Sequence, residues 1–440
     1  DDLAYQDTFV KACLAAGINA EVIDPEEAKK MEPSVNPSLI GAVKVPDGSV
    51  DPFRLCASNV FDAKIHGAKV LVYSEVIEFI KEQDTIKGVK VLDHHTGIVT
   101  DYYAPVTVNA GGIWGHHIAQ MAGANISMFP AKGALLIFAH RVNSVVINRC
   151  RKPANADILV PGDTVCVIGT TSTRVPYEEC DHLKVTPDEV DLLLTEGAKL
   201  APCLAETRVL RAYAGVRPLV SADNDPSGRN ISRGIVCLDH ETRDGIKGFI
   251  SITGGKLMTY RLMGEMAADA VCKKLGRDAK CVTADTPLPG SEPGGIEEIS
   301  KKIWEVPTMV QKASVGRFGT QAANLDFDGD VKGSLVCECE EVSVSEVDSA
   351  IENLEVNNLV DLRRRTRFGM GTCQGELCAC RAAGRLAKAR KCTAKARADL
   401  KDFMDERWKG MYPVAWGETL RESAYTQWVY SEVMGLGEEI

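Results

Sequence analysis

The sequence predicts a chain of mixed α/β and α+β class, with two interleaved domains followed by a small helical domain. Three observations predict this class. Residues 51–127 and 248–275 alternate helix signals with apolar strands that end at Gly-Gly, as in nucleotide-binding α/β domains. Residues 128–247, which lie between these segments, indicate mostly antiparallel strands. Closely spaced cysteines at residues 337–378 lie among helix-start signals near the carboxyl end.

The composition is that of a globular protein. The 440 residues are 45% hydrophobic and 25% charged, which is typical of a soluble chain with two or three domains. The formal net charge of −10 argues against nucleic acid as a partner, because phosphate binding needs an excess of Lys and Arg. No apolar run reaches the roughly 18 residues of a membrane-spanning helix, so we expect no transmembrane segment. The fifteen cysteines indicate cytosolic thiols, a few of them ligands.

Residues 1–50 are predicted to be a linking segment of the antiparallel domain, and residues 51–127 to begin the α/β domain. A helix is expected over residues 7–16. An Asp followed by Pro marks a helix start at Asp24 and again at Asp51, and the second helix should end near His66. Strands are then expected at residues 69–73, 76–82, 88–93 and 104–115.

The antiparallel domain is predicted over residues 128–247. Its strands are expected at residues 133–139, 145–148, 157–160, 164–170, 213–219 and 231–236. A capping box between Thr186 and Glu189 predicts a helix that reaches about Lys199. Residues 248–275 return to the α/β domain, with a strand that ends at Gly-Gly and a helix whose apolar residues recur every four positions.

The carboxyl-terminal part is predicted to be mainly helical. Residues 276–333 are rich in Gly and Pro and should form a partly structured linker. Residues 334–392 should form the small helical domain, where Ser343 and Glu346 make a second capping box, and residues 393–440 a helical tail. The basic run from Arg363 to Arg367 is interpreted as a solvated helix face, with docking to an acidic partner as the alternative.

Two cysteine pairs give the sequence its clearest functional signal. Cys337 and Cys339 form a C-x-C pair, and Cys373 and Cys378 form a C-x4-C pair just before a predicted helix. Four thiolates can bind a 2Fe-2S cluster, and the N–H groups at the start of the helix would offset its negative charge. Zinc accepts the same sulfurs but favours C-x2-C pairs, and unrelated core cysteines are the third interpretation.

Two further cysteines bear on the ligand set. Cys380 lies close enough to Cys378 to compete with it as the fourth ligand. Cys392 is interpreted as a bystander. The fourth ligand therefore stays open between the first two.

The cluster segment and several other motifs resemble known families. Residues 335–340 and 372–380 are similar to the bacterioferritin-associated-ferredoxin-like 2Fe-2S domain. With them, four further motifs occur in one order, at residues 43–48, 109–114, 214–219 and 253–261. Essentially the whole chain thereby resembles the A subunits of anaerobic glycerol-3-phosphate dehydrogenases, which share the fold of glycine oxidase and D-amino-acid oxidase.

This resemblance implies an FAD-binding α/β domain interleaved with an antiparallel substrate domain, plus a small helical iron-sulfur domain. Gly-Gly before a helix allows close backbone approach and offers N–H donors. A simple turn is the alternative interpretation. The residues that the resemblance assigns to FAD are Val76 at the adenine, Ala110 and Gly111 near the ribose or pyrophosphate, and Gly254, Gly255, Lys256, Leu257, Met258 and Thr259 at the isoalloxazine ring.

The resemblance also implies a substrate site for sn-glycerol 3-phosphate, a dianion with a secondary alcohol. Fixed cations suit such a substrate, and Arg binds phosphate with two parallel hydrogen bonds. Arg217 and Lys256 are the expected catalytic residues at the alcohol oxygen, where they would favour its deprotonation. Arg233 is expected on the phosphate, and Arg211 is a further substrate-binding candidate. Each Arg alone would more simply be a surface ion pair.

Two features of the family pattern are missing from these residues. Related dehydrogenases carry a His after a Lys-Gly pair near the flavin, whereas Lys132-Gly133 is followed by Ala134. The base is therefore unassigned: His116, His117 and His240 remain, and each is more simply structural. The resemblance also implies an amino-terminal strand, G-x-G-x-x-G turn and helix for the FAD pyrophosphate, which residues 1–440 do not contain.

The function implied is oxidation of glycerol 3-phosphate to dihydroxyacetone phosphate, with electrons passing through the 2Fe-2S cluster towards a membrane quinone. The implied partners are an iron-sulfur membrane anchor and a flavin subunit. The implied location is peripheral, on the cytoplasmic face of the inner membrane. The alternatives are an electron-transfer and docking module without catalysis, or a related flavin-dependent amino-acid or hydroxy-acid oxidoreductase.

Overall fold

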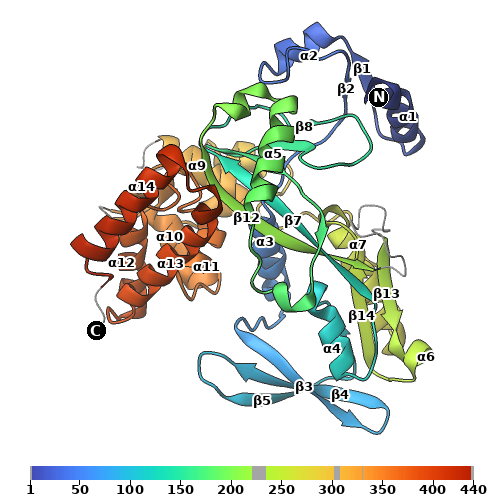
Figure 1. Cartoon of the computed structure of the whole chain (residues 1–440). Coiled ribbons are helices and arrows are strands. Elements are labelled where there is room, and N and C mark those ends of the chain that lie inside the picture. The colour runs from blue at the N-terminus through green and yellow to red at the C-terminus, as the bar shows by residue number, and fades with distance from the viewer. Residues whose placement is uncertain (1, 221–233, 302–307, 330, 438–440) are drawn as a thin grey trace.

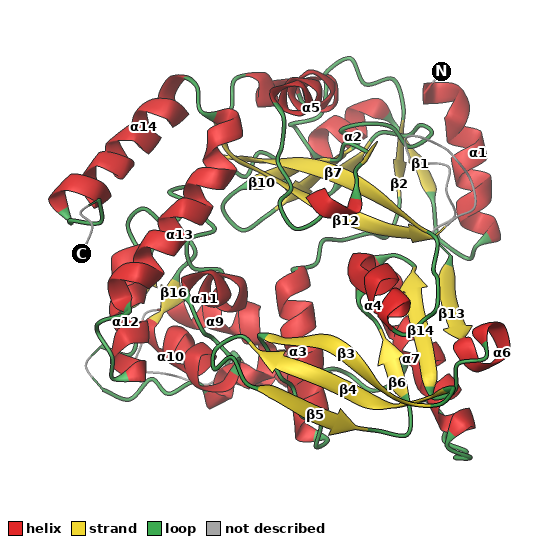
Figure 2. Ribbon diagram, turned by 60° about the horizontal axis from the view of Figure 1, so that its bottom comes forward, coloured by secondary structure: helices red, strands yellow, loops and turns green. Residues whose placement is uncertain are grey.

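The structure is a computed structural model that describes residues 2–220, 234–301, 308–329 and 331–437. Two strand-rich layers stand beside a helical carboxyl-terminal part (Figure 1, Figure 2). The antiparallel sheet with β7 and β12 lies in one layer. The other holds the β3–β5 meander and the small sheet with β6 and β14.

The amino-terminal segment contains α1 (Asp2–Ala15), β1 (Glu21–Ile23), α2 (Pro25–Met31) and β2 (Ala42–Lys44), and β1 pairs with β2. It is followed by α3 (Pro52–Ile65). Both predicted Asp caps are confirmed. The Asp24 carboxylate accepts from the Glu26 amide at 2.8 Å, and Asp51 accepts from the Phe53 and Arg54 amides.

The α/β layer is built from two separate segments of the chain. The first forms the antiparallel meander β3 (Ser74–Glu82), β4 (Thr85–Asp93) and β5 (Val99–Tyr103), then β6 (Thr107–Asn109) and α4 (Gly115–Met121). The second forms β14 (Phe249–Gly254) and α7 (Tyr260–Lys274). Because β14 pairs in parallel with β6 and antiparallel with β13 (Ile235–Asp239), the predicted interleaving is confirmed.

Three strand predictions in this layer were wrong or incomplete. Residues 69–73 form no strand, and Tyr73 instead adopts a left-handed backbone with φ 53°. Of residues 104–115 only Thr107–Asn109 is extended, because the glycines that follow begin a turn into α4. The fully exposed strand β5 was not predicted, since it has no buried face to produce a periodic pattern.

The antiparallel sheet is organised around its two longest strands, β7 (Met128–Phe138) and β12 (Val209–Val220), which pair along almost their whole length. The other strands are β8 (Ile147–Asn148), β9 (Ile158–Pro161), β10 (Cys166–Gly169) and β11 (Thr173–Arg174). The predicted capping box starts α5 (Pro187–Leu200), which packs on the apolar core of this sheet. The short helix α6 (His240–Asp244) follows β13.

The carboxyl-terminal part forms a separate core. Its elements are α8 (Gly295–Ile299), α9 (Thr308–Phe318), β15 (Leu335–Cys337), β16 (Val342–Ser343), α10 (Val344–Asn353), α11 (Leu359–Thr366), α12 (Ala379–Arg390), α13 (Ala396–Met411) and α14 (Gly417–Trp428). Residues of α13 and the buried Tyr430 complete the core around the cysteines. The remaining short helices are Gly112–Trp114, Tyr177–Glu179, Pro202–Ala205, Leu257–Thr259, Gly319–Asn324, Tyr412–Val414 and Val429–Val433.

The basic run at the end of α11 is not a solvated face, so that interpretation was wrong. Arg363 is half-buried and donates to the Gln374 side chain at 3.1 Å, and the loss of hydration lowers its pKa well below the ordinary value. Arg365 donates to the Leu354 carbonyl. Only Arg364 of the run is exposed. No helix in the described ranges has the length and apolar character needed to cross a membrane.

Candidate cluster and flavin sites

The four predicted cysteine ligands come together in the carboxyl-terminal core. The Cys378 thiol hydrogen-bonds with Cys337 and Cys373, and Cys373 also interacts with Cys339. The hydrogen bond with Cys378 lowers the pKa of the Cys373 thiol to about 5, and the other such bond lowers the pKa of Cys337. The pKa of Cys378 is raised by the same two bonds. Lowered thiol pKa values favour the thiolate form that binds metals.

The arrangement of these sulfurs fits a two-iron cluster. A 2Fe-2S cluster divides four thiolates between two irons. Cys378 is also the N-cap of α12, so the positive end of that helix faces the sulfurs. The donor set therefore fits the cluster that the resemblance implies.

Cys378 and Cys380 have different surroundings in the structure. The Cys378 side chain is 1% exposed and lies with the other ligands. The Cys380 sulfur instead lies 3.7 Å from the Met434 sulfur and interacts with Tyr430, on the tail side of α12. This geometry favours Cys378 as the fourth ligand.

Glycines and a glutamine shape the two cysteine loops. A Cβ on Gly371 would lie 2.4 Å from the Cys339 Cβ, so only glycine lets these loops meet. Gly375 has φ +94° and packs against the Phe403 ring of α13. Gln374, which is 1% exposed, donates to the Met370 and Gly371 carbonyls and closes the loop. The cysteine spacing predicted the ligands, but it did not predict the residues that shape the loops around them.

A buried ion cluster fastens the cysteine loops to the rest of the molecule. Arg367 donates to Glu340 at 2.8 Å and to Asp51, the cap of α3, at 2.9 Å. The Thr164 hydroxyl, in the β9–β10 turn, donates to the other Glu340 oxygen at 2.8 Å. Burial alone lowers the pKa of Arg367, but the carboxylates of Glu340, Asp51 and Asp163 raise it above its ordinary value. We call Arg367, Glu340 and Asp51 the clamp.

The candidate flavin site lies at the carboxyl ends of two parallel strands. Strand β6 is followed by Ala110 and Gly111, and β14 ends at Gly254 and Gly255. Because the strands are parallel and in register, both glycine pairs lie at one edge of the sheet, which is where α/β sheets bind nucleotides. Gly254 has φ +76°, and a Cβ there would lie 2.4 Å from the Gly234 carbonyl oxygen. The residues present therefore fit the nucleotide cofactor that the resemblance implies.

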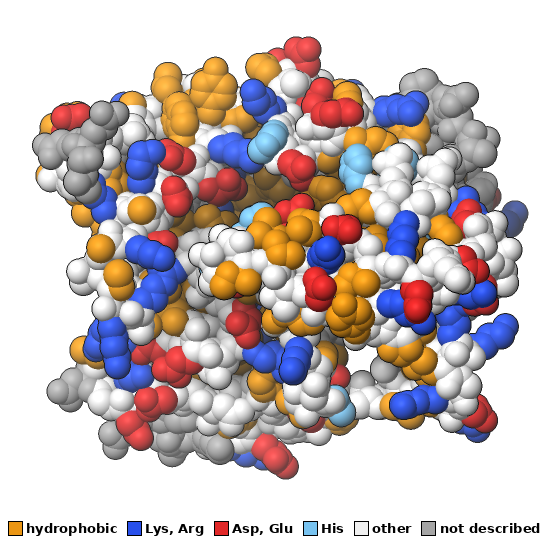
Figure 3. All heavy atoms as spheres, turned by 90° about the horizontal axis from the view of Figure 1, so that it is seen from below, with side chains coloured by type: hydrophobic (Ala, Val, Ile, Leu, Met, Phe, Trp, Pro, Cys, Tyr) orange, Lys and Arg blue, Asp and Glu red, His pale blue; other side chains and the backbone are white. Residues whose placement is uncertain are grey.

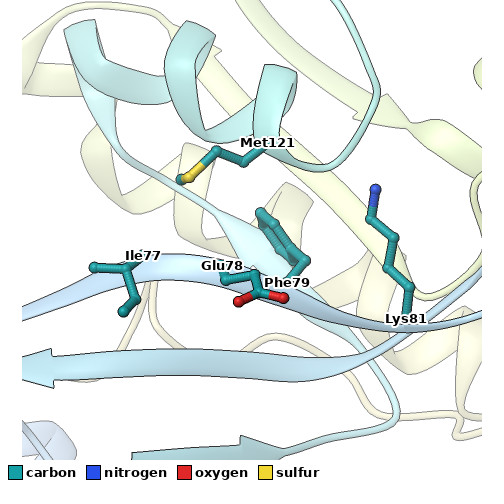
Figure 4. A pocket seen from close by; sticks show the side chains of 5 residues that line it. All are labelled: Ile77, Glu78, Phe79, Lys81 and Met121. Carbon is teal, nitrogen blue, oxygen red and sulfur yellow. The ribbon is translucent and has the colours of Figure 1, made fainter. Parts of the chain in front are cut away.

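The predicted residues after Gly255 continue this edge. Lys256 is exposed and caps the short helix Leu257–Thr259, where its amide donates to the Thr259 hydroxyl at 3.0 Å. Met258 is 75% exposed, which leaves this turn open to a ligand. Val76 lies on β3, next to a shallow pocket between β3 and α4 lined by Ile77, Glu78, Phe79, Lys81 and Met121 (Figure 4).

Arg217 lies on β12, which packs against β14. Its guanidinium donates to the Thr170 hydroxyl at 2.5 Å and to the Thr171 carbonyl at 3.3 Å, and it crosses Gly133, where a Cβ would lie 2.5 Å from it. The neighbouring Lys132 does not join Arg217; its ammonium group donates to the Glu189 carboxylate at 2.9 Å. Thr170 and the glycine under the guanidinium were not predicted, because the sequence does not show which strands become neighbours.

The structure places the two other predicted substrate residues differently. Arg211 is 6% exposed and donates to the Glu406 carboxylate and carbonyl, so it joins β12 to α13. A Cβ on Gly410 of α13 would lie 2.4 Å from the Arg211 Nε. This placement contradicts a substrate-binding role for Arg211, which was inferred from a strand position without its neighbour. Arg233 lies outside the described residues.

The candidate histidines have structural surroundings. His240 is fully buried, stacks on Phe249 and bonds Asp244 and Ser251 through its two ring nitrogens. His116 bonds the Ile126 carbonyl at 2.7 Å and stacks on Tyr177. His117 packs edge-on against the same tyrosine. The structure therefore assigns His240 to the core and brings none of the three forward as the base.

Strand β10 connects the two sites. At its amino end the β9–β10 turn carries Thr164, which bonds Glu340 beside Cys339, a predicted cluster ligand. At its other end Thr170 bonds Arg217. Strand β10, Cys166–Gly169, therefore lies between a contact to the cysteine loops and a contact to the candidate substrate site.

The face shown in Figure 3 mixes positive and negative side chains, and hydrophobic side chains gather around a hollow. No continuous basic field covers this face, in agreement with the acidic composition.

Comparisons with known proteins agree with this architecture. The family model for FAD dependent oxidoreductases matches residues 1–261, and the model for BFD-like 2Fe-2S binding domains matches residues 335–386. A glycerol-3-phosphate dehydrogenase from Bacillus halodurans, solved in complex with FAD, shares the fold with a TM-score of 0.69 at 21% identity. That likeness covers 91% of this chain and 84% of the other.

Two curated proteins are much closer in sequence. The A subunit of the anaerobic glycerol-3-phosphate dehydrogenase of Haemophilus influenzae is 58% identical over 439 residues, which cover 100% of this chain and 78% of that protein. The protein of the same name from Escherichia coli K12 is 59% identical over 440 residues, or 100% and 81% of the two chains. The chain therefore belongs to the family of anaerobic glycerol-3-phosphate dehydrogenase A subunits, which joins an FAD-dependent oxidoreductase fold to a 2Fe-2S binding domain.

Proposed function

We propose that the chain oxidises sn-glycerol 3-phosphate to dihydroxyacetone phosphate and delivers the electrons, through its 2Fe-2S cluster, towards a membrane quinone. The single observation that carries this proposal is the connection of two sites in one chain. A nucleotide-type Gly-Gly edge and a four-cysteine site are held together by the clamp and by β10. The names of the close relatives identify the substrate.

Each site has a defined part in the reaction. FAD, when bound at the edge formed by β6 and β14, supplies the acceptor for the hydride that leaves C2. Arg217 would hold the alcohol oxygen with a guanidinium whose orientation is set by Thr170 and Thr171. Lys256, exposed at the end of β14, would place a second positive charge there and favour loss of the hydroxyl proton. Arg233 stays the proposed phosphate ligand.

Electrons then need a route out of the chain. A 2Fe-2S cluster held by Cys337, Cys339, Cys373 and Cys378 would supply one-electron transfer, so the two electrons from each substrate molecule would leave the chain singly. We propose that two partner subunits, one with a flavin and one an iron-sulfur membrane anchor, complete this route. With them the chain would lie peripherally on the cytoplasmic face of the inner membrane. The naming of the relatives as one lettered component of an enzyme supports further subunits.

Anaerobic reduction tests the catalytic part of the proposal. Protein loaded with FAD and iron is mixed with glycerol 3-phosphate while flavin absorbance and the electron paramagnetic resonance of the reduced cluster are followed. Bleaching of the flavin followed by appearance of the cluster signal is the expected result. Glycerol and glycine serve as control substrates, since neither carries the phosphate.

Two results would replace this function with an alternative. Flavin bleaching by amino acids or hydroxy acids, but not by glycerol 3-phosphate, would indicate a related oxidase. A cluster that dithionite reduces, in a protein whose flavin no substrate bleaches, would indicate an electron-transfer module without catalysis.

A further inference from the structure

Helix α14 has its polar and apolar faces reversed. The residues that it buries are Thr419, Ser423 and Thr426, while Leu420 is 46% and Trp428 55% exposed. A surface helix of a globular protein normally turns its apolar stripe towards the core. In α14 the described part of the chain leaves about half of each of these apolar side chains exposed.

The inner face of α14 is held by hydrogen bonds instead. The Thr419 hydroxyl donates to the Val209 carbonyl of β12 at 2.7 Å, and the Ser423 hydroxyl donates to the Thr419 carbonyl at 2.6 Å. Only the first of these bonds joins α14 to another element, and the buried Thr426 hydroxyl has no hydrogen-bond partner among the described residues. The bond to β12 therefore fixes which side of the first turn faces inwards.

Further exposed aromatic side chains lie in the segment just before α14, where Trp408 packs on Tyr412, as Tyr425 packs on Trp428 in the helix. The exposed members of these two segments, which we call the outer aromatic face, are Trp408, Tyr412, Trp416, Leu420, Tyr425 and Trp428. Their side chains are between 38% and 68% exposed, and the face holds three of the five tryptophans in the sequence. Tryptophan and tyrosine at this density are typical of binding surfaces. All lie after residue 386, where the match to the 2Fe-2S domain model ends.

The end of α14 leads directly to the cluster. The Tyr430 hydroxyl donates to the Glu376 carbonyl at 2.5 Å, inside the loop between Cys373 and Cys378. In the same loop Leu377 is 62% exposed. Figure 1 shows α14 on the outer side of the helical part, and the first turn of the helix touches β12 through Thr419. A molecule seated on this face and on Leu377 would lie next to the loop between Cys373 and Cys378.

We propose that the outer aromatic face, together with Leu377, is the docking surface for the partner subunit that takes electrons from the cluster. The proposal rests on the proposed function, because it needs a cluster that exports electrons. The net charge of this region favours a protein over a lipid surface as the occupant of the outer aromatic face. Residues 401–440 contain eight Asp and Glu but only four Lys and Arg, which would repel anionic lipid headgroups. The occupant is therefore a protein whose apolar contact is rimmed with Lys and Arg.

Substitution on the two faces of the molecule tests the proposal. The enzyme is co-expressed with its partner subunits, and the Trp428→Glu and Leu420→Glu variants are compared with Ile98→Glu, a side chain that is 61% exposed in the distant β4–β5 turn. Binding of the partner subunits to the tagged chain should fall about tenfold or more in the two α14 variants, as for hot-spot residues, and stay unchanged in the control. Quinone reduction should fall in parallel.

Substrate-driven bleaching of the flavin and reduction of the cluster separate this proposal from the proposed function. Both should keep wild-type rates in all three variants, because α14 contacts neither Arg217 nor the Gly-Gly edge. Undiminished partner binding by Trp428→Glu would overturn the docking surface and leave the proposed function intact. The docking surface would also be overturned if the variants kept partner binding but no longer bound anionic lipid vesicles. The same holds if they kept partner binding but lost a dimer seen by light scattering. Failure of the wild-type flavin to bleach would overturn the proposed function instead.

Discussion

Removal of the Arg367 side chain should release the cluster domain from the rest of the molecule. Its guanidinium is 17% exposed and bonds two carboxylates, of which Glu340 is fully buried and Asp51 is 17% exposed. Removing one partner of a buried ion pair costs about 3–5 kcal/mol, because the remaining charge is left without compensation. Partial exposure of Asp51 places Arg367→Ala near the lower end, at about 3 kcal/mol. The left-handed backbone of residue 367, at φ +71°, costs a similar amount in both proteins and cancels.

Urea unfolding of the iron-loaded protein, followed by loss of the cluster absorbance, measures this effect. With a slope of about 1–3 kcal/mol per molar urea, a loss of about 3 kcal/mol lowers the midpoint by about 1 M or more. Arg421→Ala is the matched control, since its pair with Glu418 is 78% and 65% exposed and should contribute less than about 1 kcal/mol. Equal midpoints for the two variants would refute the role of the clamp.

Three other predictions concern the sites themselves. Arg217→Ala should slow flavin reduction by glycerol 3-phosphate about 10²-fold, because a donor to the developing oxyanion is lost; a wild-type rate in stopped-flow absorbance would contradict this. Cys339→Ser should abolish the cluster absorbance while Cys380→Ser keeps it, and iron analysis decides the matter, since iron loss in the second variant would make Cys380 the ligand. Gly254→Ala should cost about 1–3 kcal/mol and reduce FAD content, because its Cβ would meet the Gly234 carbonyl; full FAD content at an unchanged melting temperature would rule out this account.

Local signals were the part of the fold that the sequence predicted well. The capping boxes at Thr186 and Ser343 and the Asp caps at Asp24 and Asp51 are all confirmed, because a cap depends on residues within one turn of each other. The four cysteines of the predicted cluster site come together in one core, and their role as ligands stays a prediction. The spacing alone did not decide between Cys378 and its neighbour.

Contacts between distant segments were the part that could not be predicted. Arg211 and Arg217 occupy one strand and look alike in sequence, but Glu406 binds the first and Thr170 the second. The basic run ending at Arg367 was predicted to face solvent. Its partner Asp51 lies more than three hundred residues earlier, and no local sequence pattern indicates that the two residues pair. Which side chain pairs with which depends on packing that propensity does not encode.

The cover that α13 and the tail place over the cysteine loops has a consequence for biosynthesis. Phe403 closes against Gly369 and Gly375, and Tyr430 seals the loop between the last two ligands. During synthesis, the four cysteines are added to the chain before the residues that cover them, so their thiols are at first uncovered. Because chains fold progressively as they are synthesised, metal donors have their easiest access in this interval. Iron and sulfide would therefore be delivered to a nascent or newly released polypeptide, before its final helices settle.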